Sequence, residues 1–422
     1  MAEPIIRFRN NHSDWDRFVI DDVFELRNGY TPSKNVNQYW ENGVIPWFRM
    51  EDIRANGGIL SDSIQHITPQ AVKGGGLFVP YSIILATTAT IGVHAMVIAD
   101  SLANQRFTNF SIRKSLIDKY DSYFIYYAFY KIDEWSLKNT NSGGLLSVDI
   151  KGLLKQPFLT PSKTEQQQIA SYFKSLDVLI QSVTKKIASL KQLKSASLIS
   201  MFPQAGETKP RVRFKGFEEV WKTVPFDIVF RYLKSNTLSR ADLNETLGSA
   251  RNIHYGDILI KFGTLIDIRK DDLPYITNHF LANQLTNNCK LQKGDIIFAD
   301  AAEDSTVGKC TEIAFIGEEK VVAGLHTIPC RTLFEFSEGY LGFYLNSPSY
   351  HNQLLPLMQG TKISSISKSA LLNTSISFPS NIAEQCQIAS FFCSLDTQIS
   401  LETQRLDKFK QIKSACLDKM FV

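Results

Sequence analysis

Two clusters of acidic side chains are the first candidates for catalysis or metal binding in this 422-residue chain. Residues 318–320, Glu-Glu-Lys, have the acid-x-lysine spacing of some nucleases, but they lie between two short apolar runs, where an exposed hairpin turn is expected. Asp300, Glu303 and Asp304 offer oxygen ligands to a cation, yet the related residues 86–90, Ala-Thr-Thr-Ala-Thr, carry no acid. The sequence also contains no phosphate-binding glycine loop, no His-Glu-x-x-His and no Pro-Pro of the amino-methyltransferase motif. We therefore expect neither a catalytic residue nor a metal site.

The strongest pattern in the sequence is a long internal repeat. Residues 165–202 return as residues 384–421 at a constant offset of 219, and 20 of the 38 positions are identical. The openings of the two copies, residues 7–24 and 213–230, also align without gaps, while the middles share only short fragments. The period is far longer than that of solenoid repeats, which is ~20–50 residues. The chain therefore holds two copies of one domain-sized unit, a pseudo-two-fold arrangement suited to reading something built in two halves.

Each copy ends in a long helix whose apolar residues repeat every 3.5 positions, which is typical of a coiled coil. Residues 162–165 and 381–384 have the pattern of capping boxes, each after a proline. A helix of roughly 37 residues spans about 55 Å, and we expect the two helices to pair antiparallel. Glu402 interrupts the apolar seam and needs an edge position or a lysine partner. The other expected seam residues are Ile169, Phe173, Leu176, Ile180, Val183, Ile187, Leu190, Ile388, Phe392, Leu395, Ile399, Leu406 and Phe409.

The regions before the helices contain short apolar runs between turn residues, which predict strands, and one aromatic-rich helix each. The fold class is therefore α+β, with two pseudo-symmetric strand-rich domains joined by two long antiparallel coiled-coil helices. The expected segments are a first domain, a first helix, a linker, a second domain and a second helix, at residues 1–160, 161–202, 203–212, 213–378 and 379–422.

Composition limits where the protein works and how it binds. The sequence has no run of 18 apolar residues and no apolar signal region near its start, so we expect a cytoplasmic protein without a membrane span. Its six cysteines all lie in the second copy, which favours reduced thiols over disulfides. The net charge of +4 comes from the first long helix, because residues 1–160 and 203–378 are each neutral. Any DNA binding must therefore rest on local clusters and on partners.

The motifs that precede the helices make the chain recognisable. Residues 144–151, Gly-Leu-Leu-Ser-Val-Asp-Ile-Lys, and residues 360–368, Gly-Thr-Lys-Ile-Ser-Ser-Ile-Ser-Lys, are each followed by Pro-Ser, Glu-Gln and Gln-Ile-Ala. Over its whole length the chain resembles the specificity subunit of type I restriction–modification enzymes. The resemblance implies two target-recognition domains, each reading one half of a bipartite, asymmetric site in double-stranded DNA. It also implies that the helices form a spacer on which two methyltransferase subunits dock, and that restriction/translocase subunits join the larger complex.

The resemblance implies a non-catalytic subunit, with S-adenosylmethionine, ATP and Mg bound by its partners. It does not identify the residues that read bases, so these are chosen by chemistry: basic and amide side chains on loops and strand ends. The expected DNA-binding residues are Trp47, Arg49, Arg54, Asn104, Gln105 and Arg106 in the first domain, and Arg251, Lys261, Lys309, His326, Thr361 and Lys362 in the second.

Two other functions stay open from the sequence. The chain could be a stand-alone DNA methyltransferase or nuclease, although the expected motifs are missing. It could also be a coiled-coil scaffold that binds no DNA, which the neutral domains permit. The DNA target, the gap between its halves and the presence of nuclease subunits cannot be read from one chain.

Overall fold

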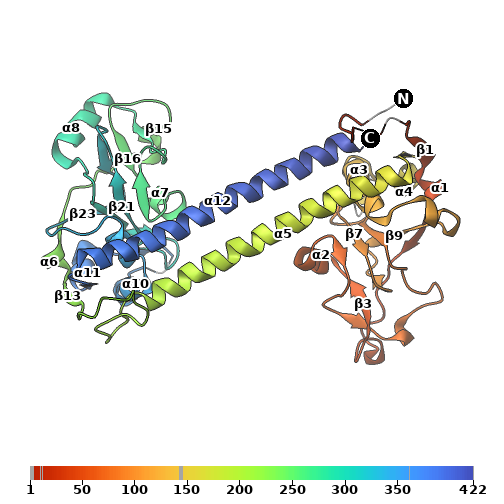
Figure 1. The fold of residues 1–422 in the computed structure, drawn as a ribbon, viewed down its shortest axis with the longest axis horizontal. Helices are drawn as coiled ribbons and strands as arrows, with labels where there is room; N and C mark the ends of the chain where they lie inside the picture. Colours follow the sequence, from red (N-terminus) through yellow and green to blue (C-terminus); the bar gives the residue numbers. More distant parts are fainter. Residues whose placement is uncertain (1–3, 10, 12, 142–145, 361, 422) are drawn as a thin grey trace. The chain divides into compact units, whose positions relative to one another are not determined.

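The chain folds into two compact units, each containing a mixed globular part. A computed structural model describes residues 4–9, 11, 13–141, 146–360 and 362–421. Unit 1 consists of residues 1–184 and 404–422, and unit 2 consists of residues 185–403. Two long helices, α5 (Lys163–Ser200) and α12 (Ile382–Met420), each contribute one part to each unit (Figure 1). In the described ranges, no helix is both long enough and apolar enough to cross a lipid bilayer.

Unit 1 is built on a five-stranded sheet beside a smaller three-stranded one. The five-stranded sheet is antiparallel except at its edge, where its last two strands run parallel. Its strands, in spatial order, are β2 (Phe24–Asn28), β9 (Phe107–Ile112), β6 (Ser82–Ala86), β7 (His94–Val97) and β4 (Ile59–Leu60). The smaller sheet has the order β5 (His66–Ile67), β3 (Ile45–Phe48) and β8 (Leu102–Ala103), with β3 parallel to β8.

The remaining elements of unit 1 cover these sheets and connect them to the long helices. The aromatic-rich run predicted from sequence forms α3 (Ser122–Lys138), and its rings pack into the core: Phe129 lies 5.5 Å from Phe24 and 5.4 Å from Phe110 between ring centroids. These rings are therefore core residues. The other elements are β1 (Asp16–Val19) paired with β12 (Pro157–Thr160), β10 (Thr140–Asn141) paired with β11 (Ser147–Val148), and the helices α1 (Ile20–Val23), α2 (Met50–Asn56) and α4 (Ile150–Leu154).

Unit 2 repeats the strand order of unit 1 although the two middles share little sequence. Its five-stranded sheet also ends in a parallel pair. The strands are β14 (Phe230–Tyr232), β23 (Thr327–Thr332), β19 (Ile296–Ala299), β21 (Cys310–Phe315) and β17 (Leu265–Asp267). A second sheet has the order β15 (Leu243–Asn244), β18 (Tyr275–Ile276), β16 (Arg251–Ile253) and β22 (Val321–Ala323), with β16 parallel to β22.

Helices and two short strand pairs complete unit 2. They are α6 (Phe226–Val229), α7 (Tyr255–Ile260), α8 (His279–Cys289), α9 (Tyr340–Leu345), α10 (Pro348–Leu354) and α11 (Lys368–Leu372), with β13 (Lys222–Pro225) paired to β25 (Ser375–Phe378) and β20 (Ala301–Ala302) paired to β24 (Ser364–Ser365). The α+β class with two pseudo-symmetric strand-rich domains is thus confirmed. All six cysteines are thiols, as expected.

The predicted capping boxes are present in half. Ser162 accepts a hydrogen bond from the N–H of Glu165 at 3.4 Å and Asn381 accepts one from the N–H of Ala383 at 2.9 Å, so both residues cap their helices.

The reciprocal bond from each glutamate is replaced by a contact with the opening of its own unit. The carboxylate of Glu165 does not return to the helix start but accepts two hydrogen bonds from Arg7, at 2.7 and 2.8 Å. Glu384 accepts the equivalent pair from Arg213, at 2.6 and 2.8 Å. Both carboxylates are buried, so a bidentate guanidinium supplies the charge and the donors that they need.

The glutamine that follows each of these glutamates has an equally specific role. Gln166 donates to the carbonyl of Pro161 and accepts from the backbone N–H of Asp121, just before α3. Gln385 donates to the carbonyl of Pro379 and accepts from Ser337, just before α9. In each copy, the arginine of the opening and the Glu-Gln pair at the start of the long helix therefore connect the opening, the long helix and the segment before α3 or α9.

Ion pairs between α5 and α12 show that the helices run antiparallel. In unit 1, Lys413 contacts Asp177 at 2.6 Å; in unit 2, Lys186 contacts Glu402 at 2.5 Å and Lys194 contacts Asp396 at 2.5 Å. Higher numbers in α5 thus meet lower numbers in α12. All thirteen expected seam residues are buried or half-buried. Glu402, which interrupts the seam, is half-buried and has a lysine partner.

Candidate nucleic-acid interface

In unit 1 the polar candidates gather where two parallel strands end. β3 and β8 end at Phe48 and Ala103, and the N–H of Asn104 donates to the carbonyl of Phe48 at 3.0 Å. The side chain of Asn104 accepts from the N–H of Arg106 at 3.0 Å, and Gln105 accepts a hydrogen bond from Thr31. Because both strands run in the same direction, the loops that follow them emerge at one edge of the sheet.

Arg49 joins this edge because it is the residue before α2. Its backbone N–H donates to Asp52 at 2.7 Å, and its guanidinium lies 5.8 Å from the ring of Trp47. Arg54 is exposed in the last turn of the same helix, and Arg106 is exposed at the strand end. Arg49, Gln105 and Arg106 thus follow the ends of two neighbouring parallel strands. Gln105 and Arg106 are exposed, whereas Arg49 is half-buried and contacts Glu51 at 3.8 Å.

Trp47 lies in the core of unit 1. Only 2% of its surface is exposed, its indole N–H donates to the carbonyl of Tyr30 at 2.9 Å, and its ring meets Trp40 edge to face. A ring buried in this way packs the domain and offers no face to a base. Trp47, which was expected to bind DNA, is therefore a packing residue of the domain core.

Unit 2 has the same edge with different side chains. The N–H of Gly324 donates to the carbonyl of Ile253 at 2.8 Å, which repeats the Asn104–Phe48 bond of unit 1. The N–H of Asp300 donates to the carbonyl of His326 at 3.0 Å, which repeats the bond from Thr87 to Arg106. His326 and Arg106 are therefore structurally equivalent, although neither sequence position suggests it.

His326 is held in place from two sides. Its Nδ1 lies 3.1 Å from a carboxylate oxygen of Asp300, and its ring meets Tyr255 edge to face at 5.2 Å. Its backbone has a φ of 53°, in the left-handed region that bulky residues seldom adopt. Burial raises the pKa of Asp300, while His326 acts in the opposite direction. Asp300, one of three acids considered as cation ligands, thus serves as the partner of a histidine.

Two other candidates in unit 2, Arg251 and Lys309, are held by contacts within the unit. Arg251 stacks over Tyr275 at 4.3 Å and contacts Glu319 at 3.3 Å. Lys309 donates to the carbonyls of Leu259 and Phe262 around the end of α7, and burial lowers its pKa.

The remaining candidates of unit 2 lie on its surface or outside the described residues. The ammonium of Lys261 donates to the carbonyl of Asp272 at 2.6 Å, although this lysine is exposed. Lys362 is exposed, and Thr361 lies outside the described residues. Sequence alone shows these cations but not the carbonyl oxygens and rings that engage Arg251, Lys261 and Lys309.

Sequence reasoning missed two groups at the edge of unit 2. His254 precedes α7 as Arg49 precedes α2, and it accepts from the N–H of Gly256 at 3.2 Å. Its pKa is lowered by burial and by nearby Arg240. Arg240 forms two hydrogen bonds with Asp257, at 3.0 and 2.8 Å. In the sequence, the aspartate follows Arg49 and His254 at the same distance of three residues, at Asp52 and Asp257, and this shared spacing could have pointed to His254.

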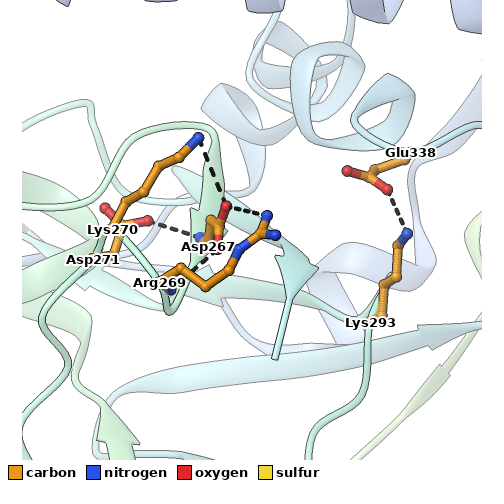
Figure 2. A network of polar contacts seen from close by, with 6 residues as sticks. All are labelled: Asp267, Arg269, Lys270, Asp271, Lys293 and Glu338. Carbon is orange, nitrogen blue, oxygen red and sulfur yellow. Dashed lines mark hydrogen bonds and ion pairs between the residues drawn. The ribbon is translucent and has the colours of Figure 1, made fainter. Parts of the chain in front are cut away.

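Figure 2 shows a second charged network in unit 2. It lies at the first residues of β19, because Asp267 pairs with Phe315 on β21, beyond the pair Glu312–Ile296, whereas Asp300 follows the last residue of β19. Arg269 donates to both carboxylate oxygens of Asp267 and stacks over Phe315 at 3.9 Å, while Lys270 contacts the same acid. The Arg269 hydrogen bonds lower the pKa of Asp267 to about 2. Lys293 pairs with Glu338 at 2.5 Å. Each of these cations faces an acid, so the network is a neutralised surface. Across the described ranges, no group of three or more His, Cys, Asp or Glu side chains is arranged to hold a metal ion.

Comparison with known proteins defines the class. The family model of the type I restriction modification DNA specificity domain matches residues 12–192 and again residues 246–411. These two matches cover most of the chain, which therefore belongs to that family. The two matches also agree with the two copies inferred from the repeat.

Individual relatives agree with this family. The type I restriction enzyme EcoprrI specificity subunit of Escherichia coli is 51% identical over 139 residues, 33% of this chain and 34% of that protein. The MjaIX specificity subunit of Methanocaldococcus jannaschii is 32% identical over 185 residues, 43% of this chain and 42% of that protein. The chain thus matches less than half the length of each of these curated relatives.

Solved structures show the same fold. The S subunit of a type I restriction–modification system from M. genitalium superposes with a TM-score of 0.58 at 14% identity, covering 100% of this chain and 99% of that one. A second structure, described as the basis of complex assembly in the type I R-M system, gives 0.59 at 13% identity, over 97% and 98%. At such low identity the likeness concerns the fold.

Proposed function

We propose that this chain is the DNA sequence-recognition subunit of a type I restriction–modification complex, with one half of a bipartite, asymmetric site read by each unit. One observation carries the proposal. The two units share strand order and backbone hydrogen bonds, but their equivalent edges carry different side chains, such as Arg106 in one and His326 in the other. Identical scaffolds with different donors and acceptors are suited to two different base sequences.

The partners follow from the same proposal. Two methyltransferase subunits dock on the long helices and bind S-adenosylmethionine, and restriction/translocase subunits with ATP and Mg join the larger assembly in the cytoplasm. The long helices support this role because α5 carries six lysines against two acids, while the globular parts are neutral. The family does not favour the alternatives of a stand-alone methyltransferase, a nuclease or a scaffold without DNA binding.

The test maps methylated bases. The chain is expressed with its modification partner in cells without other DNA methylation, and the genome is read by single-molecule sequencing. We expect one asymmetric bipartite motif that needs both proteins. Methylation by the chain alone would indicate an enzyme, and an unchanged motif without the chain would reject a recognition role. Salt-dependent binding of duplex DNA by the assembled complex, measured by fluorescence anisotropy, would exclude the scaffold alternative.

A further inference from the structure

An arginine in unit 2 is positioned at the candidate edge by a buried acid. Arg240 begins a short 3-10 turn, Arg240–Asp242, and its Nη1 and Nη2 donate to the two carboxylate oxygens of Asp257 at 3.0 and 2.8 Å. Asp257 lies in the first turn of α7, three residues after His254. A Cβ added at Gly256 would lie 3.4 Å from the ring of His254 and 3.9 Å from Nη2 of Arg240. The guanidinium therefore sits beside the edge that also holds His326.

The equivalent acid in unit 1 has a different partner. Asp52 occupies the same place in α2, and its two oxygens accept backbone N–H groups of Arg49 and Ile64, each at 2.7 Å. An acid at this position can thus be fully satisfied by backbone groups. In unit 2 the two oxygens of Asp257 face the guanidinium of Arg240. The pairing is a feature of unit 2, so the shared scaffold does not explain it.

Exposure shows what this pairing leaves available. The Asp257 side chain is 10% exposed, whereas the Arg240 side chain is 52% exposed. A planar guanidinium has five N–H donors, and a carboxylate that faces its two terminal nitrogens uses only two of them. The remaining donors of Arg240, including Nε–H, belong to an exposed guanidinium whose orientation is fixed by the buried carboxylate of Asp257. An exposed ion pair of this kind adds little stability, but it fixes the direction of the donors before a ligand arrives.

We propose that Arg240 reads a guanine in the half-site of unit 2 and that Asp257 is the positioning residue that orients it. A guanidinium edge donating to O6 and N7 of guanine in the major groove is the commonest specific contact between a side chain and a base. This inference rests on the proposed function. It adds Arg240, which is not among the DNA-binding residues expected from the sequence, and it names guanine as the base.

The experiment uses the complex assembled with the modification partner and fluorescent duplexes that carry the mapped site. Each guanine of the unit 2 half-site is replaced in turn by 7-deazaguanine, which lacks N7. For the wild-type complex we expect one position at which the dissociation constant rises measurably, by less than the ~5- to 150-fold that a whole bidentate contact supplies, because 7-deazaguanine keeps O6 and loses one of the two acceptors. Arg240→Lys keeps the charge but loses the fork, so it should lose a similar factor on unmodified DNA and become insensitive to that replacement. Asp257→Asn should weaken binding less and remain sensitive.

Arg269→Lys is the matched control. Arg269 is also an exposed arginine of unit 2 paired with an aspartate, at 2.7 Å (Figure 2). Its partner Asp267 pairs with β21 near the first residues of β19, away from the edge at Asp300. We expect it to bind as the wild type does.

Either of two results would overturn the proposal: a wild-type complex that tolerates 7-deazaguanine at every position, or an Arg240→Lys complex with wild-type affinity and profile. If the Arg240→Lys protein does not assemble with the partner, Arg240→Gln replaces it in the same binding assay, and the same outcome of wild-type affinity and profile would overturn the proposal. A wild-type complex that binds no bipartite site would instead reject the proposed function.

Discussion

Arg106 and His326 place two different side chains at one equivalent backbone position. Each is the residue before β9 or β23, the second strand of its five-stranded sheet, and each has its carbonyl bonded to the equivalent loop of its unit, at 2.9 and 3.0 Å. A guanidinium offers several donors, whereas a histidine held by a carboxylate offers one ring edge. The difference between the half-sites can therefore arise from single side chains on an unchanged backbone.

Replacing Arg106 should affect the first half-site alone. We expect Arg106→Ala to weaken binding of the assembled complex by ~5- to 150-fold if it reads a base, and to relax methylation at one position of that half-site. Arg113→Ala is the control, because Arg113 follows the other end of β9 and contacts Asp21 and Glu25. Methylation mapping checks the motif, and anisotropy checks affinity. A change in the second half-site would contradict the assignment.

The buried carboxylate of Glu312 leads us to expect that unit 2 becomes less stable as pH rises. Its buried carboxylate accepts from the N–H groups of Gly339 and Gly342, and burial raises its pKa to about 7. The protonated form is thus favoured in the folded state. The contribution of Glu312 to the free energy of unfolding is complete below the ordinary carboxyl pKa and is lost as pH rises through about 7. The loss amounts to up to about 3 kcal/mol.

Hydrogen exchange in α9, corrected for intrinsic rates, measures this effect. For the wild type we expect the opening free energy of α9 to fall between pH 5 and pH 8. Glu312→Gln cannot ionise, so its opening free energy should stay nearly constant over this range. Equal slopes for the two proteins would exclude Glu312 as the cause.

The proposed function predicts that the paired helices set the distance between the two half-sites. Their ion pairs, Lys413–Asp177, Lys186–Glu402 and Lys194–Asp396, keep one antiparallel register within both units. Insertion into one helix would offset this register, so a test of length should extend both helices equally.

We expect four helical residues inserted after Thr184, with four more after Thr403, to lengthen the gap between half-sites by about one or two base pairs. Four residues add ~6 Å to each helix, and DNA rises ~3.4 Å per base pair. Both half-site sequences should stay the same. The check is a methylome of the double-insertion protein, with insertion in α5 alone as the comparison. An unchanged gap with full methylation would mean that these helices are not the ruler.

For the whole molecule, the division into two similar units predicts independent half-sites. Exchanging residues 1–160 for the first domain of another member of this family should change one half-site and leave the other unchanged. The replacement must still pack on Phe173 of α5, Leu417 of α12 and Phe421, which follows α12, because these residues belong to the core of unit 1. Methylation mapping of the hybrid checks the prediction, and changes in both halves would refute it.

The duplication, the long helices, the α+β class and the family could all be inferred before the fold was known. Each rests on local pattern: a gap-free repeat, a 3.5-residue period, and motifs of contiguous residues. The seam residues are buried as a period of this kind requires, because helix geometry alone brings them to one face. The same period places Glu402 on the face between the helices, where its carboxylate contacts Lys186.

The site depended on contacts between residues that are distant in sequence. Nothing near Arg240 in the chain indicates that its guanidinium meets Asp257, and nothing near Lys309 indicates that it meets carbonyls at the end of α7. The equivalence of Arg106 and His326 appears only when backbone hydrogen bonds align the strands. Charge and residue type are visible in the sequence, but burial and partners follow from strand register, which long-range packing sets.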